Sequence, residues 1–207
     1  MQIENLIVGM LEVNCYLVWE PVAKHGFVID PGGDAEKIEA RIEALGIVPR
    51  GILLTHAHVD HIHGVPRLAR KYGVDVSLHP EDHDLYRSPQ NELPPWLPSV
   101  KNLPAPGKVP HDLDGLQYQV YHTPGHTRGG VCYYFPDAGV IFTGDTLFRG
   151  GVGRTDLPGG NHGQLVKSIH EKLLGLPPGT VVYPGHGPAS TIVRETTQNP
   201  FLGKDSP

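Results

Sequence analysis

The sequence predicts an α/β fold in which short strands alternate with helices and deliver their loops to one edge. Short apolar runs recur along the whole chain, and amphipathic runs with helical spacing lie between them. No internal repeat, low-complexity tract or linker divides the sequence. We therefore expect one globular domain over residues 1–207, with a layered α/β architecture and a sizeable core.

The first half of the chain contains four predicted strands and two predicted helices. The apolar runs that predict strands cover residues 14–19, 26–30, 51–55 and 74–78. Asp34 is a candidate cap for a helix that ends at Gly46. A second, continuous helix should carry Ile62, Val65, Ala69 and Tyr72 on one face and end at Gly73.

The second half is richer in strands. Apolar runs predict them over residues 118–122, 131–135, 139–143 and 180–183, and Leu165, Ile169 and Leu173 mark one helix. Between the halves, residues 88–110 contain seven prolines, which exclude a helix or a central strand. This stretch is either a substrate wall or a plain surface connection.

Composition narrows the classes of partner. The formal net charge is −5, which argues against nucleic acid or an anionic membrane surface as a partner. Neither a signal sequence nor an apolar membrane span is recognisable near the start, so a cytoplasmic location is expected. We expect a small-molecule substrate and a monomer or small homo-oligomer.

Four apolar runs lead directly into turns that carry candidate metal ligands. The first turn carries His56, His58, Asp60 and His61, and the other three carry His126, Asp145 and His186. Turns rich in glycine or proline at strand ends can bring such side chains to one rigid point. Four ligands on one turn, followed by three more strand-end ligands, indicate a metal site.

The spacing within the first cluster points to more than one ion. In an extended segment, His56 and His58 lie on the same side, whereas Asp60 and His61 begin the next helix and can address a second ion. Seven ligands are too many for one ion that also keeps a water. Two divalent cations are expected, with zinc as the first choice and iron or manganese also suited to His and Asp ligands.

The full pattern of ligands resembles the metallo-β-lactamase superfamily, and the resemblance covers essentially the whole chain. It implies a four-layer αβ/βα sandwich. It also implies one ion at His56, His58 and His126, a second at Asp60, His61 and His186, and Asp145 as the bridging ligand. Asp30, in another motif of this family, is expected to support the ligands. His63 and His122 lie beside candidate ligands in the sequence and are candidates for a supporting role.

Within the superfamily, the sequence is most similar to compact proteins of the glyoxalase II type. True β-lactamases of this fold generally carry Cys or Ser where this chain has Asp145. Residues 144–148 and 150–154 resemble glyoxalase II, in which a basic residue near Arg154 contacts glutathione. Arg154 is therefore a candidate substrate anchor, or simply an ion-pair partner of Asp156. Only 21 residues follow His186, so we expect no counterpart of the helical C-terminal domain of glyoxalase II, which supplies part of the glutathione pocket.

The resemblance predicts a hydrolase that cleaves thioesters such as S-2-hydroxyacylglutathione. A metal-bound hydroxide would attack the thioester carbonyl, and Asp60 and Asp145 would orient the water and accept its proton. The alternative is a persulfide dioxygenase with a single iron at His56, His126 and Asp145, because those enzymes share this motif. A binding module without catalysis is the third alternative.

Overall fold

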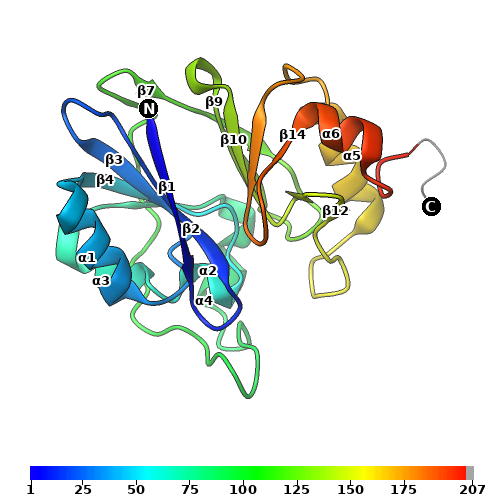
Figure 1. Ribbon diagram of the computed structural model, residues 1–207. Helices are drawn as coiled ribbons and strands as arrows, with labels where there is room; N and C mark the ends of the chain where they lie inside the picture. Colours follow the sequence, from blue (N-terminus) through cyan, green and yellow to red (C-terminus); the bar gives the residue numbers. More distant parts are fainter. Residues whose placement is uncertain (204–207) are drawn as a thin grey trace. The chain divides into compact units, whose positions relative to one another are not determined.

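A five-stranded mixed sheet organises the first part of the chain (Figure 1). The computed structural model describes residues 1–203 and divides the chain into two units, Met1–Gln117 and Tyr118 onward. In the first unit the strand order is β1-β2-β3-β4-β5. The strands are β1 (Gln2–Val8), β2 (Val13–Trp19), β3 (His25–Ile29), β4 (Val48–Leu53) and β5 (Val76–Ser77).

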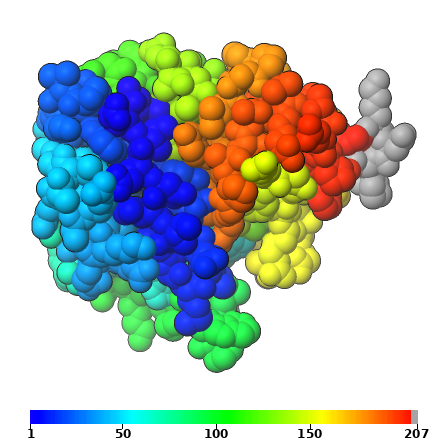
Figure 2. All heavy atoms as spheres, viewed as in Figure 1, coloured from blue at the N-terminus to red at the C-terminus, as the bar shows by residue number. Residues whose placement is uncertain are grey.

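The direction of these strands places three loops at one edge of the sheet. β1, β2 and β3 pair antiparallel, whereas β3 pairs parallel to β4 and β4 parallel to β5. The loops after β3, β4 and β5 therefore leave the sheet on the same side. β1 was not expected from the sequence; it is an edge strand and lies at the surface in dark blue in Figure 2.

The helices of the first unit are short, and two expectations need correction. The helices are α1 (Ala35–Leu45), α2 (Val59–Ile62), α3 (Val65–Tyr72), α4 (His83–Arg87) and the 3₁₀ turn η1 (Pro80–Asp82). Asp34 precedes α1, but its carboxylate accepts the Gly9 N–H at 3.0 Å instead of capping the helix. The predicted second helix is divided into α2 and α3. Gly64 explains the break, because its N–H donates to the Pro31 carbonyl at 2.7 Å and a Cβ would approach that oxygen to 2.8 Å.

The proline-rich stretch over residues 88–110 is irregular, as predicted. Within residues 88–110, all of which the structure describes, regular backbone pairing is limited to one isolated bridge between Leu93 and Leu97. Trp96 is 61% exposed, so it is not a packing residue of the core. A small hairpin of β6 (Asp112–Leu113) and β7 (Leu116–Gln117) completes the unit.

The second unit has its own five-stranded sheet, in the order β14-β13-β10-β9-β8. The strands are β8 (Gln119–His122), β9 (Val131–Phe135), β10 (Val140–Gly144), β13 (Val181–Pro184) and β14 (Ser190–Thr191). β9 pairs antiparallel to both β8 and β10, and β10 pairs parallel to β13. β8, β10 and β13 consequently run in one direction, and the loops that follow them leave at one edge.

Two helices and a small hairpin accompany this sheet. They are α5 (His162–Lys172), α6 (Ile192–Gln198), the hairpin of β11 (Leu147–Phe148) and β12 (Gly151–Val152), and the 3₁₀ turn η2 (Pro136–Ala138). Leu165 and Ile169 of α5, with Leu173 just after the helix, are buried in one apolar cluster with the sheet residues Ile141 and Val182. Every strand predicted from the sequence is present, with ends shifted by a few residues. Among residues 1–203, no helix combines the length and apolar character needed to cross a membrane.

Candidate metal centre

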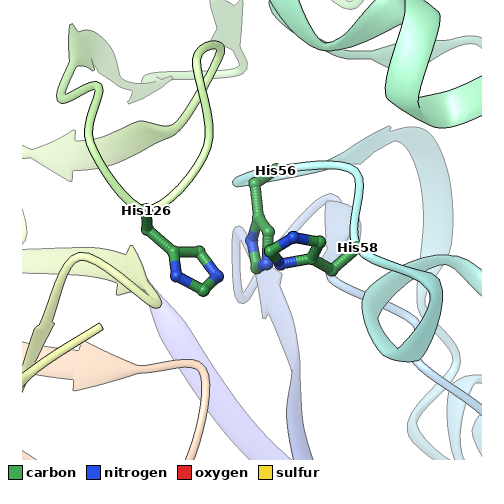
Figure 3. Close-up of side chains that lie close together, drawn as sticks. All are labelled: His56, His58 and His126. Carbon is green, nitrogen blue, oxygen red and sulfur yellow. The ribbon is translucent and has the colours of Figure 1, made fainter. Parts of the chain in front are cut away.

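The four candidate ligands of the first cluster lie together between the end of β4 and the first turn of α2. His56 and His58 are on the loop between these elements, and Asp60 and His61 are in the first turn of α2. His58 has the extended backbone that the alternating spacing predicts. The rings of His56 and His58 meet edge to face with centroids 4.8 Å apart, and those of His56 and His61 lie 4.1 Å apart. Figure 3 shows His56 and His58 on this loop and His126 on a loop of the second unit.

Asp30 supports this cluster from the end of β3. Its carboxylate is buried and accepts three hydrogen bonds. Thr55 donates its N–H at 2.8 Å and its hydroxyl at 2.6 Å, and His61 donates Nδ1–H at 3.0 Å. Asp30 therefore has the supporting position that the sequence suggested.

The hydrogen bonds to Asp30 also decide which ring nitrogen each histidine presents. Because the Thr55 hydroxyl donates to Asp30, its oxygen accepts from Nδ1 of His56, 3.1 Å away. The proton on Nδ1 leaves a lone pair on Nε2 in both His56 and His61, which is the form that binds a metal. Nε2 of His61 is 3.8 Å from Oδ2 of Asp60.

The three candidate ligands of the second unit come from three strand ends. His126 follows β8, Asp145 follows β10 and His186 follows β13. Oδ2 of Asp145 is 3.6 Å from Nε2 of His126 and 3.7 Å from Nε2 of His186. The common direction of the three strands thus brings together residues that are far apart in the sequence.

His126 is supported by backbone groups rather than by a carboxylate. Its Nδ1 donates to the Arg154 carbonyl at 2.7 Å, which again leaves the lone pair on Nε2. This contact depends on Gly153, because a Cβ there would lie 1.8 Å from the Asp145 carbonyl oxygen and 3.1 Å from Nδ1 of His126. The glycine run before Arg154 therefore lets the backbone approach the ligands closely.

The side chain of Arg154 forms the ion pair that the sequence offered as an alternative to substrate binding. Its Nε and Nη2 donate to the two carboxylate oxygens of Asp156 at 2.8 and 2.7 Å. Both side chains are exposed. The hydrogen bond from Arg154 is the main reason that the pKa of Asp156 falls to about 2. The same hydrogen bond raises the pKa of Arg154.

The donors in both units suit a divalent metal. Two donors of one ion lie roughly 3 to 4 Å apart, since metal–ligand bonds are about 2.0–2.2 Å long. The three carboxylate-to-imidazole distances, 3.6 to 3.8 Å, are longer than hydrogen bonds and match that separation. Imidazole and carboxylate donors without a thiolate fit zinc, iron or manganese.

Several neighbouring residues have roles that the sequence did not assign. Thr55 was counted only as the end of a strand, yet it relays a hydrogen bond from His56 to Asp30. Phe148 places its ring edge to face with that of His186, at 6.4 Å. Nε2 of His63 contacts the Pro98 carbonyl and Nε2 of His122 the Arg128 carbonyl, and the supporting role considered for both stays a prediction.

Comparison with known proteins gives one family. A family model described as the metallo-β-lactamase superfamily matches residues 8–186. The chain is 38% identical to the hydroxyacylglutathione hydrolase GloC of Haemophilus influenzae, over 100% of both proteins. Among solved structures, the B3 metallo-β-lactamase BLEG-1 is 36% identical, with a TM-score of 0.88 over 97% of this chain and 99% of the other. TTHA1623 in a di-iron-bound form is 40% identical, with a TM-score of 0.83 over 96% and 100%.

Proposed function

Since the chain belongs to the metallo-β-lactamase superfamily and has its α/β sandwich fold, we propose that it is a metal-dependent hydrolase of thioesters, with S-2-hydroxyacylglutathione as the leading substrate class. The observation that carries this proposal is the set of buried imidazoles whose Nδ1 atoms are each engaged, by Asp30, Thr55 and the Arg154 carbonyl. Full-length similarity to GloC supports the choice of thioester. The proposed location is the cytoplasm.

Two divalent ions are proposed, with zinc as the first choice. His56, His58 and His126 would hold one ion, Asp60, His61 and His186 the other, and Asp145 would be shared. Similarity to a di-iron-bound protein keeps iron as an alternative metal, with manganese also compatible with these donors. When bound, such ions lower the pKa of a water molecule and polarise a carbonyl group.

The side chains of the chain itself have three proposed tasks. Asp60 and Asp145, as carboxylates beside imidazole ligands, orient the attacking water and accept its proton. Asp30 and Thr55 hold the tautomers of His56 and His61. Arg154, exposed and paired to Asp156, offers a guanidinium to a carboxylate of the substrate. A thiolate leaves without a proton donor, so the absence of a predicted general acid is consistent with this chemistry.

The test combines a substrate panel with the metal content of the purified protein. S-lactoylglutathione, a thioester without glutathione and a chromogenic β-lactam are assayed side by side, and metals are counted by elemental analysis. We expect about two metal ions per chain and turnover of the glutathione thioester. Turnover of the β-lactam alone, which the similarity to BLEG-1 makes worth measuring, would overturn the proposal.

A persulfide dioxygenase is the second candidate function, and the similarity to a di-iron-bound protein supports iron as its metal. In that case His56, His126 and Asp145 would bind one iron. Oxygen uptake with glutathione persulfide, together with one iron per chain and no thioester hydrolysis, would establish the dioxygenase in place of the hydrolase.

A further inference from the structure

Both backbone polar groups of Ala57, the residue between His56 and His58, are held by buried side chains. The Ala57 N–H donates to Oδ2 of Asp82 at 3.0 Å, and the Ala57 carbonyl accepts from Nδ2 of Asn91 at 2.7 Å. Ala57 is 0% exposed, Asp82 1% and Asn91 6%. All of these residues lie in the first unit.

The two side chains come from a single segment that follows β5. Asp82 ends the 3₁₀ turn η1 and Asn91 lies just beyond α4, at the start of the proline-rich stretch. Both residues are fixed by their own backbone, since the Asp82 N–H donates to the His79 carbonyl at 3.0 Å and the Asn91 N–H to the Ser88 carbonyl at 3.1 Å. They therefore form a rigid support for Ala57 rather than a pair of mobile side chains.

The geometry of this support matters for the imidazoles on either side. The Ala57 N–H belongs to the peptide bond with His56, and its carbonyl belongs to the peptide bond with His58. Fixing both peptide planes fixes the positions of the Cα atoms of His56 and His58 and restricts the directions of their Cα–Cβ bonds. The loop between β4 and α2 has no ladder partner at Ala57, so these two side-chain contacts replace the hydrogen bonds that a strand would supply.

We propose that Asp82 and Asn91 are positioning residues that set the metal affinity of His56 and His58 through the backbone of Ala57. This inference rests on the proposed metal site but not on the choice of substrate. In this proposal, neither Asp82 nor Asn91 contacts a metal ion or the substrate. The start of the proline-rich stretch then has a defined role, because its residue Asn91 anchors the loop between β4 and α2.

The test measures cobalt binding by the metal-free protein, which needs no substrate. Co²⁺ is titrated into wild type, Asp82→Ala and Asn91→Ala, and its affinity and visible absorption spectrum are recorded beside the Tm of each metal-free variant. We expect affinity to fall about 10- to 100-fold, as for other residues that orient metal ligands, with an altered spectrum. The matched control is Asn199→Ala, because Asn199 is also 6% exposed and also donates to a backbone carbonyl, that of Gly151 at 3.0 Å.

The control separates positioning from simple stabilisation. Asn199→Ala should lower the Tm without changing the Co²⁺ spectrum. Asp82→Asn, whose amide oxygen can still accept the Ala57 N–H, should recover most of the affinity lost in Asp82→Ala. If Asp82→Ala does not fold, Asn91→Ala keeps the inference testable. Wild-type affinity and spectrum in Asn91→Ala, and in Asp82→Ala where it folds, alongside a Tm loss like that of the control, would overturn the inference. A wild type that binds two Co²⁺ ions but hydrolyses no thioester would reject only the proposed function.

Discussion

The two units carry their candidate ligands in different ways. In the first unit, four candidates lie within residues 56–61, and carboxylate and amide side chains from other elements hold that segment. In the second unit, the candidates His126, Asp145 and His186 come from three separate strand ends, and a backbone carbonyl, that of Arg154, supports His126. A dense motif needs side chains from elsewhere to fix it, whereas ligands on rigid strand ends are already placed by the sheet.

The largest expected effect concerns Asp145, the carboxylate close to both imidazoles of the second unit. Asp145→Ala should remove at least one metal ion and reduce thioester hydrolysis to background, because the shared donor is lost. The fold should survive, since Asp145 lies in the turn after β10, outside the helices and strands. Metal analysis, activity and circular dichroism check this, with Asp137→Ala, an exposed aspartate of the same unit, as the control. Full activity in Asp145→Ala would contradict the two-ion arrangement.

A smaller effect is expected at Asp30, the side-chain support of the first unit. Asp30→Ala should lower the free energy of unfolding by about 3 kcal/mol, because buried donors of Thr55 and His61 lose their acceptor. Metal affinity should also fall about 10- to 100-fold. Urea unfolding and metal titration measure the two losses. Asp34→Ala is a matched control, since Asp34 also has a positive φ and accepts one backbone N–H but is exposed. Equal losses in both variants would mean that the strain of alanine at positive φ, not the hydrogen bonds, explains the result.

The smallest effect is expected for the side chain of Arg154. Its carbonyl supports His126 whatever the side chain, so Arg154→Ala should keep the metal content and kcat. KM for the glutathione thioester should rise about tenfold, because a charge-assisted contact to the substrate is lost. Arg149→Ala, another exposed arginine nearby in the sequence, should leave KM unchanged. A change in kcat without a change in KM would reject the anchoring role.

The same variant gives a check against pH. The folded pKa of Asp156 is lowered to about 2 from 3.8, so any stability from its pair with Arg154 is present above pH 3.8 and lost as the pH falls towards 2. Between pH 5 and 8 the Tm difference between wild type and Arg154→Ala should therefore stay constant. It should also be small, because the pair is exposed.

Much of the fold followed from short-range pattern. Apolar runs identified eight strands, and the glycines after α1 and α3 end those helices in the left-handed conformation. The short-range pattern did not reveal the division between α2 and α3. That division involves the close approach of Gly64 to Pro31, which is a contact between segments far apart in the sequence. β1 was missed for a similar reason, since a half-exposed edge strand is recognised by its pairing with β2 rather than by its own residues.

The sequence by itself determined which residues are candidate ligands, because spacing and strand ends are local properties of the chain. Only the tertiary structure decided what holds them: Asp30 and Thr55 under His56 and His61, the Arg154 carbonyl behind His126, and Asp82 with Asn91 around Ala57. Each of these partners, apart from Thr55, lies 25 or more residues from the group that it supports. Such hydrogen bonds depend on which strand ends become neighbours, and sheet pairing fixes that order only when the chain folds.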